Sequence, residues 1–168
     1  MGSLEQISQP EDIRYWHGDM PVRFAYTMGV AGERFFRELK ENARFLGSRC
    51  PQCEYTYLPP RLYCERCFAS LDGQWLEVGR QGSIEALTVA HLDLDGQPLA
   101  RPEVLALIRL DGADGLLVHR IGGAAAADVE IGQRVEAVFQ PRRQRRGSIL
   151  DIRYFTVILG PDIKPIAS

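Results

Sequence analysis

Four cysteines constrain this sequence more than any other feature, because all of them lie in one short stretch, CPQCEYTYLPPRLYCERC. They form two Cys-x-x-Cys pairs, Cys50 with Cys53 and Cys64 with Cys67, separated by ten residues. Such a stretch either holds a metal ion or pairs as disulfides. The polar start of the chain, MGSLEQISQPEDIRYWHGDM, lacks the apolar core of a secretory signal, and no apolar run approaches the length of a membrane span. We therefore expect a cytoplasmic protein without membrane association, in which disulfides are disfavoured and a metal is favoured.

Two Cys-x-x-Cys turns can place four thiolates around one ion while backbone amides point back at the sulfurs. A shell of four protein sulfurs leaves no open position, so the pattern predicts a structural site, with zinc favoured over iron. Turns of this type often carry glycine after the second cysteine, where φ is positive. This chain has Glu54 and Phe68 at those positions. With a divalent ion bound, the formal net charge of −2 becomes about −4, which makes the chain acidic.

The segment before the cysteines, from about residue 13 to 45, has a helical pattern that is clearest in GVAGERFFRELKENARFLG. Gly47 is expected to end this helix. The segment carries more apolar area than its neighbours in sequence can cover, and two interpretations stay open. The apolar side chains either pack on another subunit or cover the ribbon and the following domain. The candidate partner-interface residues are Tyr26, Phe35, Phe36 and Leu39.

Between the cysteine pairs, YTYLPPRLY has β-forming residues followed by two prolines, which predicts a short hairpin with Arg61 at its tip. Arg61 is either a solvated side chain near an acidic metal site or a ligand contact. After Trp75, five short apolar runs are separated by Gly, Pro and Asp clusters, as a small barrel of the OB type requires. The runs are SIEALTVAHLDL, EVLALIRLDG, GLLVHRIGG, QRVEAVFQP and SILDIRYFTVIL.

These segments predict a mainly β protein with N-terminal helices, a zinc ribbon and a five-stranded OB-fold barrel. A chain of 168 residues can bury one moderate core and a small satellite module. The expected divisions are an N-terminal helical segment at 1–45, a zinc ribbon at 46–73, the barrel at 74–160 and a tail at 161–168.

The sequence offers no convincing catalytic centre. His17, His91 and His119 are far apart and belong to no recognisable nucleophile or metal motif. A Gly-x-Ser-x-Gly motif, a phosphate-binding glycine loop and a spare cysteine are all absent. This pattern indicates a binding or accessory subunit.

The order of these motifs resembles a known family. A helix carrying YTMGVAGERFFRELKE, a ribbon from CPQC to CERC with PPR between, and five strands closing with DIRYF look like the acyl-CoA-associated zinc-ribbon and OB-fold family, domain of unknown function thirty-five. The resemblance covers about residues 26 to 155. It implies a rubredoxin-like ribbon, four cysteine metal ligands, a marked tip at Pro59, Pro60 and Arg61, and assembly with a thiolase-fold enzyme that handles CoA thioesters.

The resemblance therefore predicts a non-catalytic subunit of a hetero-oligomer, with a CoA thioester as a candidate ligand. Nucleic-acid binding is the alternative, because zinc ribbons and OB barrels both bind nucleic acid. The overall acidity argues against it, and a redox protein with iron in the ribbon is a weaker possibility. The segment RRQRR is expected at an exposed hairpin tip, either solvated or binding an anion such as CoA phosphate or an acidic partner patch. Its arginines are Arg142, Arg143, Arg145 and Arg146.

Overall fold

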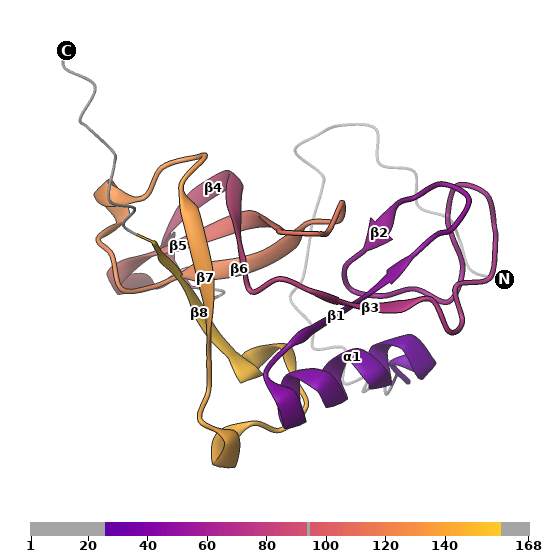
Figure 1. Cartoon of the computed structure of the whole chain (residues 1–168). Coiled ribbons are helices and arrows are strands. Elements are labelled where there is room, and N and C mark those ends of the chain that lie inside the picture. The colour runs from indigo at the N-terminus through magenta and orange to yellow at the C-terminus, as the bar shows by residue number, and fades with distance from the viewer. Residues whose placement is uncertain (1–25, 94, 159–168) are drawn as a thin grey trace, which may run out of the picture.

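The computed structural model describes residues 26–93 and 95–158, which form an α-helix, a small three-stranded sheet and a closed β-barrel (Figure 1). The predicted fold class is confirmed, with a ribbon followed by a five-stranded barrel. His17, the predicted helical residues before 26 and the predicted tail lie outside the described residues. No helix within the described ranges is both long and apolar enough to cross a membrane.

The helix α1 spans Gly29–Asn42. It ends at Ala43, whose φ of 51° is left-handed and whose N–H donates to the Leu39 carbonyl at 3.2 Å. The prediction that the helix continues to about residue 45 and stops at Gly47 is therefore wrong. Gly47 lies inside a strand, where an added Cβ would come within 2.9 Å of the Tyr57 carbonyl oxygen. Glycine is required there by this close approach of two strands.

The apolar face of α1 packs inside the chain. Phe35 and Leu39 are 1% and 0% exposed and belong to the main hydrophobic core. Both are therefore unavailable to another subunit, which removes them from the predicted partner interface. Phe36 is partly buried against the same core, whereas Tyr26 is exposed. For the two buried residues, the alternative interpretation holds: this helix face covers the chain's own sheet and barrel.

The ribbon is an antiparallel sheet in the order β2-β1-β3. Its central strand pairs Ser48 with Tyr57 on one side and with Trp75 on the other. One cysteine pair lies in the loop between β1 and β2, and the other lies between β2 and β3. The strands are β1 (Phe45–Arg49), β2 (Thr56–Tyr57) and β3 (Trp75–Val78).

The barrel contains the five predicted strands in the order β4-β5-β6-β8-β7. Antiparallel pairs make most of its circumference, and a parallel contact between β6 and β8 closes it. Its strands are β4 (Gln81–Leu92), β5 (Pro98–Leu110), β6 (Leu117–Ile121), β7 (Arg134–Phe139) and β8 (Ile152–Val157). Short 3-10 helices connect them: η2 (Ala126–Asp128), η3 (Arg142–Gln144) and η4 (Ile149–Asp151).

One hydrophobic core joins the helix, the base of the ribbon and the barrel. The ring of Phe45 at the start of β1 lies 5.4 Å from the Phe139 ring and 6.2 Å from the Phe155 ring, measured between centroids. Leu58 and Val78 of the ribbon belong to the same core. A second, smaller cluster surrounds the cysteines at the far end of the ribbon. The division of the chain at residues 45 and 73 stays a prediction, because this core crosses both positions.

Candidate metal centre

The four cysteine sulfurs converge on one point. All four Sγ atoms lie within 4.8 Å of one another, and Cys50 and Cys64 are fully buried. The Cys50 and Cys67 sulfurs are 3.5 Å apart, and the Cys53 and Cys64 sulfurs are 3.8 Å apart. A tetrahedral ion with metal–sulfur bonds of about 2.3 Å places its ligands about 3.8 Å apart, whereas a disulfide needs about 2.05 Å. The geometry therefore fits a metal site and contains no disulfide.

The two turns adopt the backbone conformation that such a site needs. The Cys53 N–H donates to the Cys50 sulfur at 3.3 Å. Glu54 and Phe68, which follow the second cysteine of each pair, have φ of 54° and 59°. Both turns are thus left-handed at the positions where glycine was expected, without having glycine there. The side chains at 54 and 68 are held in a region that costs a residue with a Cβ about 1–2 kcal/mol.

Tyr57 is a functional residue that sequence reasoning missed. Its hydroxyl lies 3.2 Å from the Cys64 sulfur and accepts the Glu65 N–H at 3.3 Å. Since the oxygen accepts from Glu65, its single proton is available to the sulfur. This hydrogen bond lowers the pKa of Cys64 to about 6 and raises the pKa of Tyr57 to about 12. The Cys67 side chain raises the pKa of Cys53 to about 12.

Strand β2 of the ribbon is also tied to the barrel. The turn between β5 and β6 lies against β2, where the Asp114 N–H donates to the Thr56 carbonyl at 3.0 Å. The Asp114 carboxylate accepts the Thr56 N–H at 2.8 Å, and the Tyr55 hydroxyl donates to the Asp114 carbonyl at 3.2 Å. A cleft of about 610 Å³ lies beside this junction. Its lining includes Tyr57, Pro59, Arg61, Arg109 and Leu116.

Arg61 lies in this cleft, with its charge already compensated. Its Nη1 donates to the Glu65 carboxylate at 2.6 Å, and its guanidinium lies 5.4 Å from the Tyr57 ring centroid. Its backbone is fixed by Ser48, whose buried hydroxyl accepts the Arg61 N–H at 2.8 Å and donates to the Arg61 carbonyl at 3.0 Å. Arg61 is thus a positioned side chain on the cleft wall.

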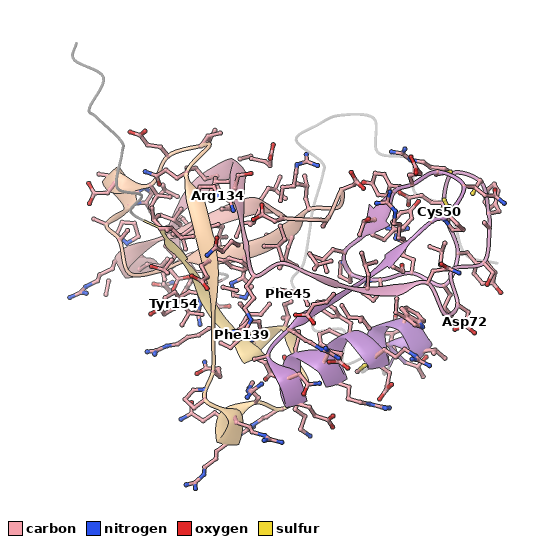
Figure 2. All side chains as sticks on the ribbon, viewed as in Figure 1. Phe45, Cys50, Asp72, Arg134, Phe139 and Tyr154 are labelled. Atoms are coloured by element: carbon pink, nitrogen blue, oxygen red, sulfur yellow. The ribbon has the colours of Figure 1, made fainter. Side chains whose placement is uncertain are left out.

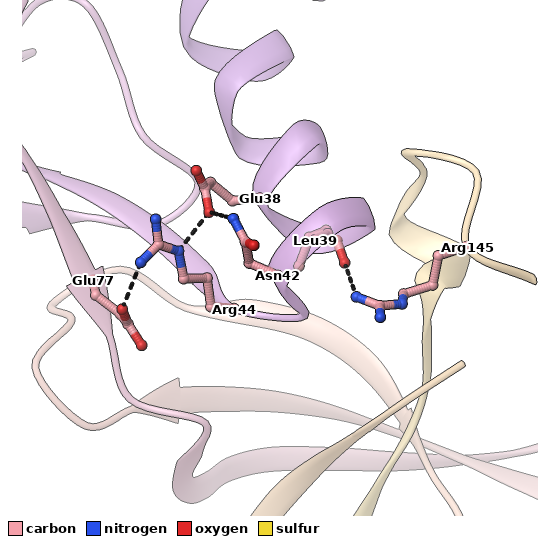
Figure 3. A network of polar contacts seen from close by, with 6 residues as sticks. All are labelled: Glu38, Leu39, Asn42, Arg44, Glu77 and Arg145. Atoms are coloured by element: carbon pink, nitrogen blue, oxygen red, sulfur yellow. Dashed lines mark hydrogen bonds and ion pairs between the residues drawn. The ribbon is translucent and has the colours of Figure 1, made fainter. Parts of the chain in front are cut away.

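The four arginines of RRQRR do not form one solvated tip. Figure 3 shows Arg145 reaching the last turn of α1, where its Nη1 donates to the Leu39 carbonyl at 3.1 Å. Arg142, Arg143 and Arg146 are exposed, and none of the ion pairs among the described residues includes them. The structure therefore separates one anchoring arginine from three that remain open to solvent.

Asp151, the first residue of the DIRYF motif, holds this arginine loop in shape. Its side chain is 2% exposed. It accepts the N–H groups of Arg146 and Gly147 at 2.8 and 2.7 Å, and that of Ser148 at 3.3 Å. The only sequence signal for this role was the capping pattern of serine followed three residues later by an acidic residue.

Neither of the two described histidines, His91 and His119, belongs to the cysteine cluster. His119 is 9% exposed and packs edge-on against the Phe155 ring, with centroids 5.7 Å apart. Burial lowers the pKa of His119, because the barrel interior disfavours the charged ring. His91 is exposed on β4. Figure 2 shows Cys50 at one end of the molecule and Tyr154 and Arg134 of the barrel toward the other, so the metal centre is remote from the barrel's far side.

A closed four-sulfur ribbon joined to a five-stranded barrel defines a zinc-ribbon/OB-fold protein. Two family models match the chain and together cover more than half of it. The first is "ChsH2, rubredoxin-like zinc ribbon domain" over residues 37–72, and the second is "ChsH2, C-terminal OB-fold domain" over residues 75–140. The chain belongs to the DUF35 family, so the resemblance inferred from the motifs is confirmed.

Individual relatives agree with this assignment. A DUF35 domain-containing scaffold protein of Methanocaldococcus jannaschii is 29% identical over 107 residues, which are 64% of this chain and 75% of that protein. Another, of Methanothermobacter thermautotrophicus, is 26% identical over 111 residues, 66% of this chain and 83% of that protein.

Two solved structures have a similar fold. A DUF35-family protein of unknown function from Sulfolobus solfataricus aligns with a TM-score of 0.58 and 28% identity, covering 77% of this chain and 84% of that one. A chain of the Ltp2-ChsH2(DUF35) aldolase aligns with a TM-score of 0.51 and 25% identity, covering 67% of this chain and 87% of that one.

Proposed function

We propose that this chain is a non-catalytic subunit that assembles with a thiolase-fold enzyme and helps to accommodate its acyl-CoA substrates. The observation that carries the proposal is the similarity to a chain of the Ltp2-ChsH2(DUF35) aldolase. The alignment covers 87% of that chain. The scaffold names of the archaeal relatives support the same role. On this proposal, the chain's chemistry is binding and positioning of a partner.

The metal is assigned a structural role in this proposal, with zinc as the ion. Cys50, Cys53, Cys64 and Cys67 would complete its tetrahedral shell, so no coordination position remains for a substrate. When bound, the ion supplies a rigid cross-link between the two ribbon loops. Iron would fit the same sulfurs, and elemental analysis of protein purified under reducing conditions separates the two.

The acyl-CoA part of the proposal rests on the distribution of arginines. Guanidinium groups bind phosphate through paired, charge-assisted hydrogen bonds. Arg142, Arg143 and Arg146 are exposed, and no ion pair within the described ranges occupies them. These three are proposed to meet the phosphates of CoA or an acidic patch of the partner. Arg61 is a second candidate on the wall of the junction cleft, where a phosphate would compete with the Glu65 carboxylate for its guanidinium.

The first experiment tests assembly. The native chain is purified by affinity from its own host, and stoichiometric companions are identified by mass spectrometry and by the mass of the complex. A thiolase-fold enzyme at fixed stoichiometry is the expected result. Recovery of the chain without any stoichiometric enzyme would overturn the proposal. Recovery with nucleic acid that stays bound through a high-salt wash would overturn it and favour the nucleic-acid alternative.

The second experiment tests the arginines in the assembled enzyme. The double variant Arg142→Glu, Arg143→Glu should raise the apparent KM for the CoA thioester or weaken assembly, and the effect should shrink as salt is raised. Arg101→Glu, an exposed charge reversal on β5, is the matched control. Unchanged assembly and kinetics of the double variant at low salt would leave these arginines as solvated side chains.

A further inference from the structure

Phe68 combines two unfavourable features in the second cysteine turn. Its φ of 59° lies in the left-handed region, which favours glycine, and the residue is 79% exposed. A large apolar residue gains nothing from water at such a position. Glycine would relieve the backbone, and a polar residue would suit the exposure. The cysteine turn itself imposes this φ, as it does at Glu54, so the exposed aromatic ring is the feature that distinguishes Phe68.

The first cysteine turn can be compared directly with this one. Glu54 occupies the equivalent position of the first turn with φ of 54°, and its side chain is 80% exposed. Glu54 is a solvated residue that forms an ion pair with Arg49 at 3.8 Å. The two turns thus share backbone conformation and exposure and differ in what they present to solvent: one presents a carboxylate, the other an aromatic ring.

The surroundings of Phe68 give it the properties of an interface anchor. The Phe68 N–H donates to the Cys64 carbonyl at 2.9 Å, so the ring stands on a turn whose backbone is closed by a hydrogen bond to one of the four candidate metal ligands. Tyr63, on the same hairpin, is also 65% exposed. The flanking Glu65 and Arg66 are held by Arg61 and by the Tyr55 ring. An aromatic side chain on a rigid support, beside charged residues that already have partners, has the composition of a binding hot spot.

The ribbon loops also lie where a second protein can reach them. They form the end of the molecule opposite the barrel (Figure 1). Because the backbone of the turn is fixed before binding, inserting the ring loses little conformational entropy.

We infer that Phe68 inserts into an apolar pocket on the partner enzyme subunit and is a principal anchor of the complex. This inference rests on the proposed function and names the part of the chain that makes the contact. A single ring on a turn presents a convex, apolar tip. The partner enzyme should therefore offer a pocket of about the size of one aromatic ring. A second copy of this chain is the competing occupant.

The test measures the melting temperature and the partner affinity of Phe68→Gly, because the variant should keep or gain stability while it loses affinity. The metal-loaded variant should melt at the same temperature as the wild type or a few degrees higher, because the backbone strain is relieved. Its Kd for the thiolase-fold enzyme that copurifies with the wild type should rise about ten- to hundredfold, as expected for losing a buried aromatic anchor. Phe68→Leu, which keeps an apolar side chain, should retain most of the affinity.

The matched control is Glu54→Gly. It makes the same change of backbone freedom in the first turn and should leave the Kd unchanged. If Phe68→Gly binds as tightly as the wild type, the inference is wrong while the proposed function stands. Weaker binding accompanied by a lower melting temperature or loss of zinc would also overturn it, because Phe68 would then be structural.

Two further outcomes decide whether Phe68 binds the enzyme or a second copy of this chain. Failure of the wild type to capture any thiolase-fold enzyme would overturn both the proposed function and this inference. If the isolated wild-type chain dimerises in sedimentation analysis and Phe68→Gly makes it monomeric, the pocket belongs to a second copy and the partner assignment is wrong.

Discussion

Replacing Arg145 with methionine should destabilise the protein by about 1 kcal/mol. Methionine keeps an unbranched apolar stem and removes the guanidinium, so the packing along the side chain is largely retained. The change deletes the hydrogen bond from Nη1 to the Leu39 carbonyl, which joins residues 106 positions apart in sequence. It therefore measures how strongly the arginine loop holds the end of α1 (Figure 3).

The magnitude follows from three opposing effects. A hydrogen bond from a charged donor contributes about 1.5–3 kcal/mol. A cation at a helix C-terminus adds about 0.3–1 kcal/mol. Against these, the Nε of Arg145 is buried without a hydrogen-bond partner, and removing such a group regains about 1–3 kcal/mol. The favourable effects exceed the unfavourable one by about 1 kcal/mol, which corresponds to a decrease in Tm of about 2–4 °C.

The assay is guanidinium chloride unfolding of the metal-loaded protein, with the midpoint compared at constant m-value. Arg143→Met is the control, because Arg143 is exposed and belongs to no ion pair in the described part of the chain. Its free energy of unfolding should change by less than about 0.5 kcal/mol. Equal stability of the two variants, or a gain in stability for Arg145→Met, would refute the reasoning. A gain would mean that the unpartnered Nε outweighs the contact with Leu39.

Three other predictions follow from the same structure. Stability should fall as pH drops below about 6.5, because the unfolded chain binds a proton that the buried His119 ring resists; His119→Gln should reduce this slope in unfolding midpoints measured between pH 7.5 and 5.5. Elemental analysis should give about one zinc per chain, and Cys64→Ser or a strong chelator should remove it together with the near-ultraviolet dichroism of the ribbon tyrosines. Ala43→Gly should raise the free energy of unfolding by about 0.5 kcal/mol, measured by chemical denaturation, because Ala43 ends α1 at φ of 51°.

The parts of this fold that the sequence predicts are those governed by local spacing. Two Cys-x-x-Cys pairs predict two turns that converge on one ion, and the four sulfurs do converge. Five short apolar runs separated by Gly, Pro and Asp clusters predict five strands, and the barrel has them. In each case the signal and its structural consequence lie within a few residues of each other, so no knowledge of tertiary contacts is needed.

The contacts that position the site are not local, and sequence patterns do not identify them. Thr56 meets Asp114 across 58 positions, and Arg145 meets Leu39 across 106. The prediction of an interface at Phe35 failed for the same reason. A helical apolar face shows that something covers it, but only the fold shows that the cover is the chain's own core.

The two hydrophobic clusters determine how far loss of the metal can spread. Cys50, Tyr57, Cys64 and Leu71 form a cluster of their own, which sulfur–metal bonds would hold together when the ion is bound. Phe45, at the base of the ribbon, belongs instead to the core shared with the barrel. Metal loss removes the support of the first cluster and leaves the second cluster's burial intact. The unfolding should therefore stop near β1 and β3, where the ribbon strands enter the shared core. A chain built in this way can lose the ordered cysteine end of its ribbon, including the turn that carries Phe68, while the barrel remains folded.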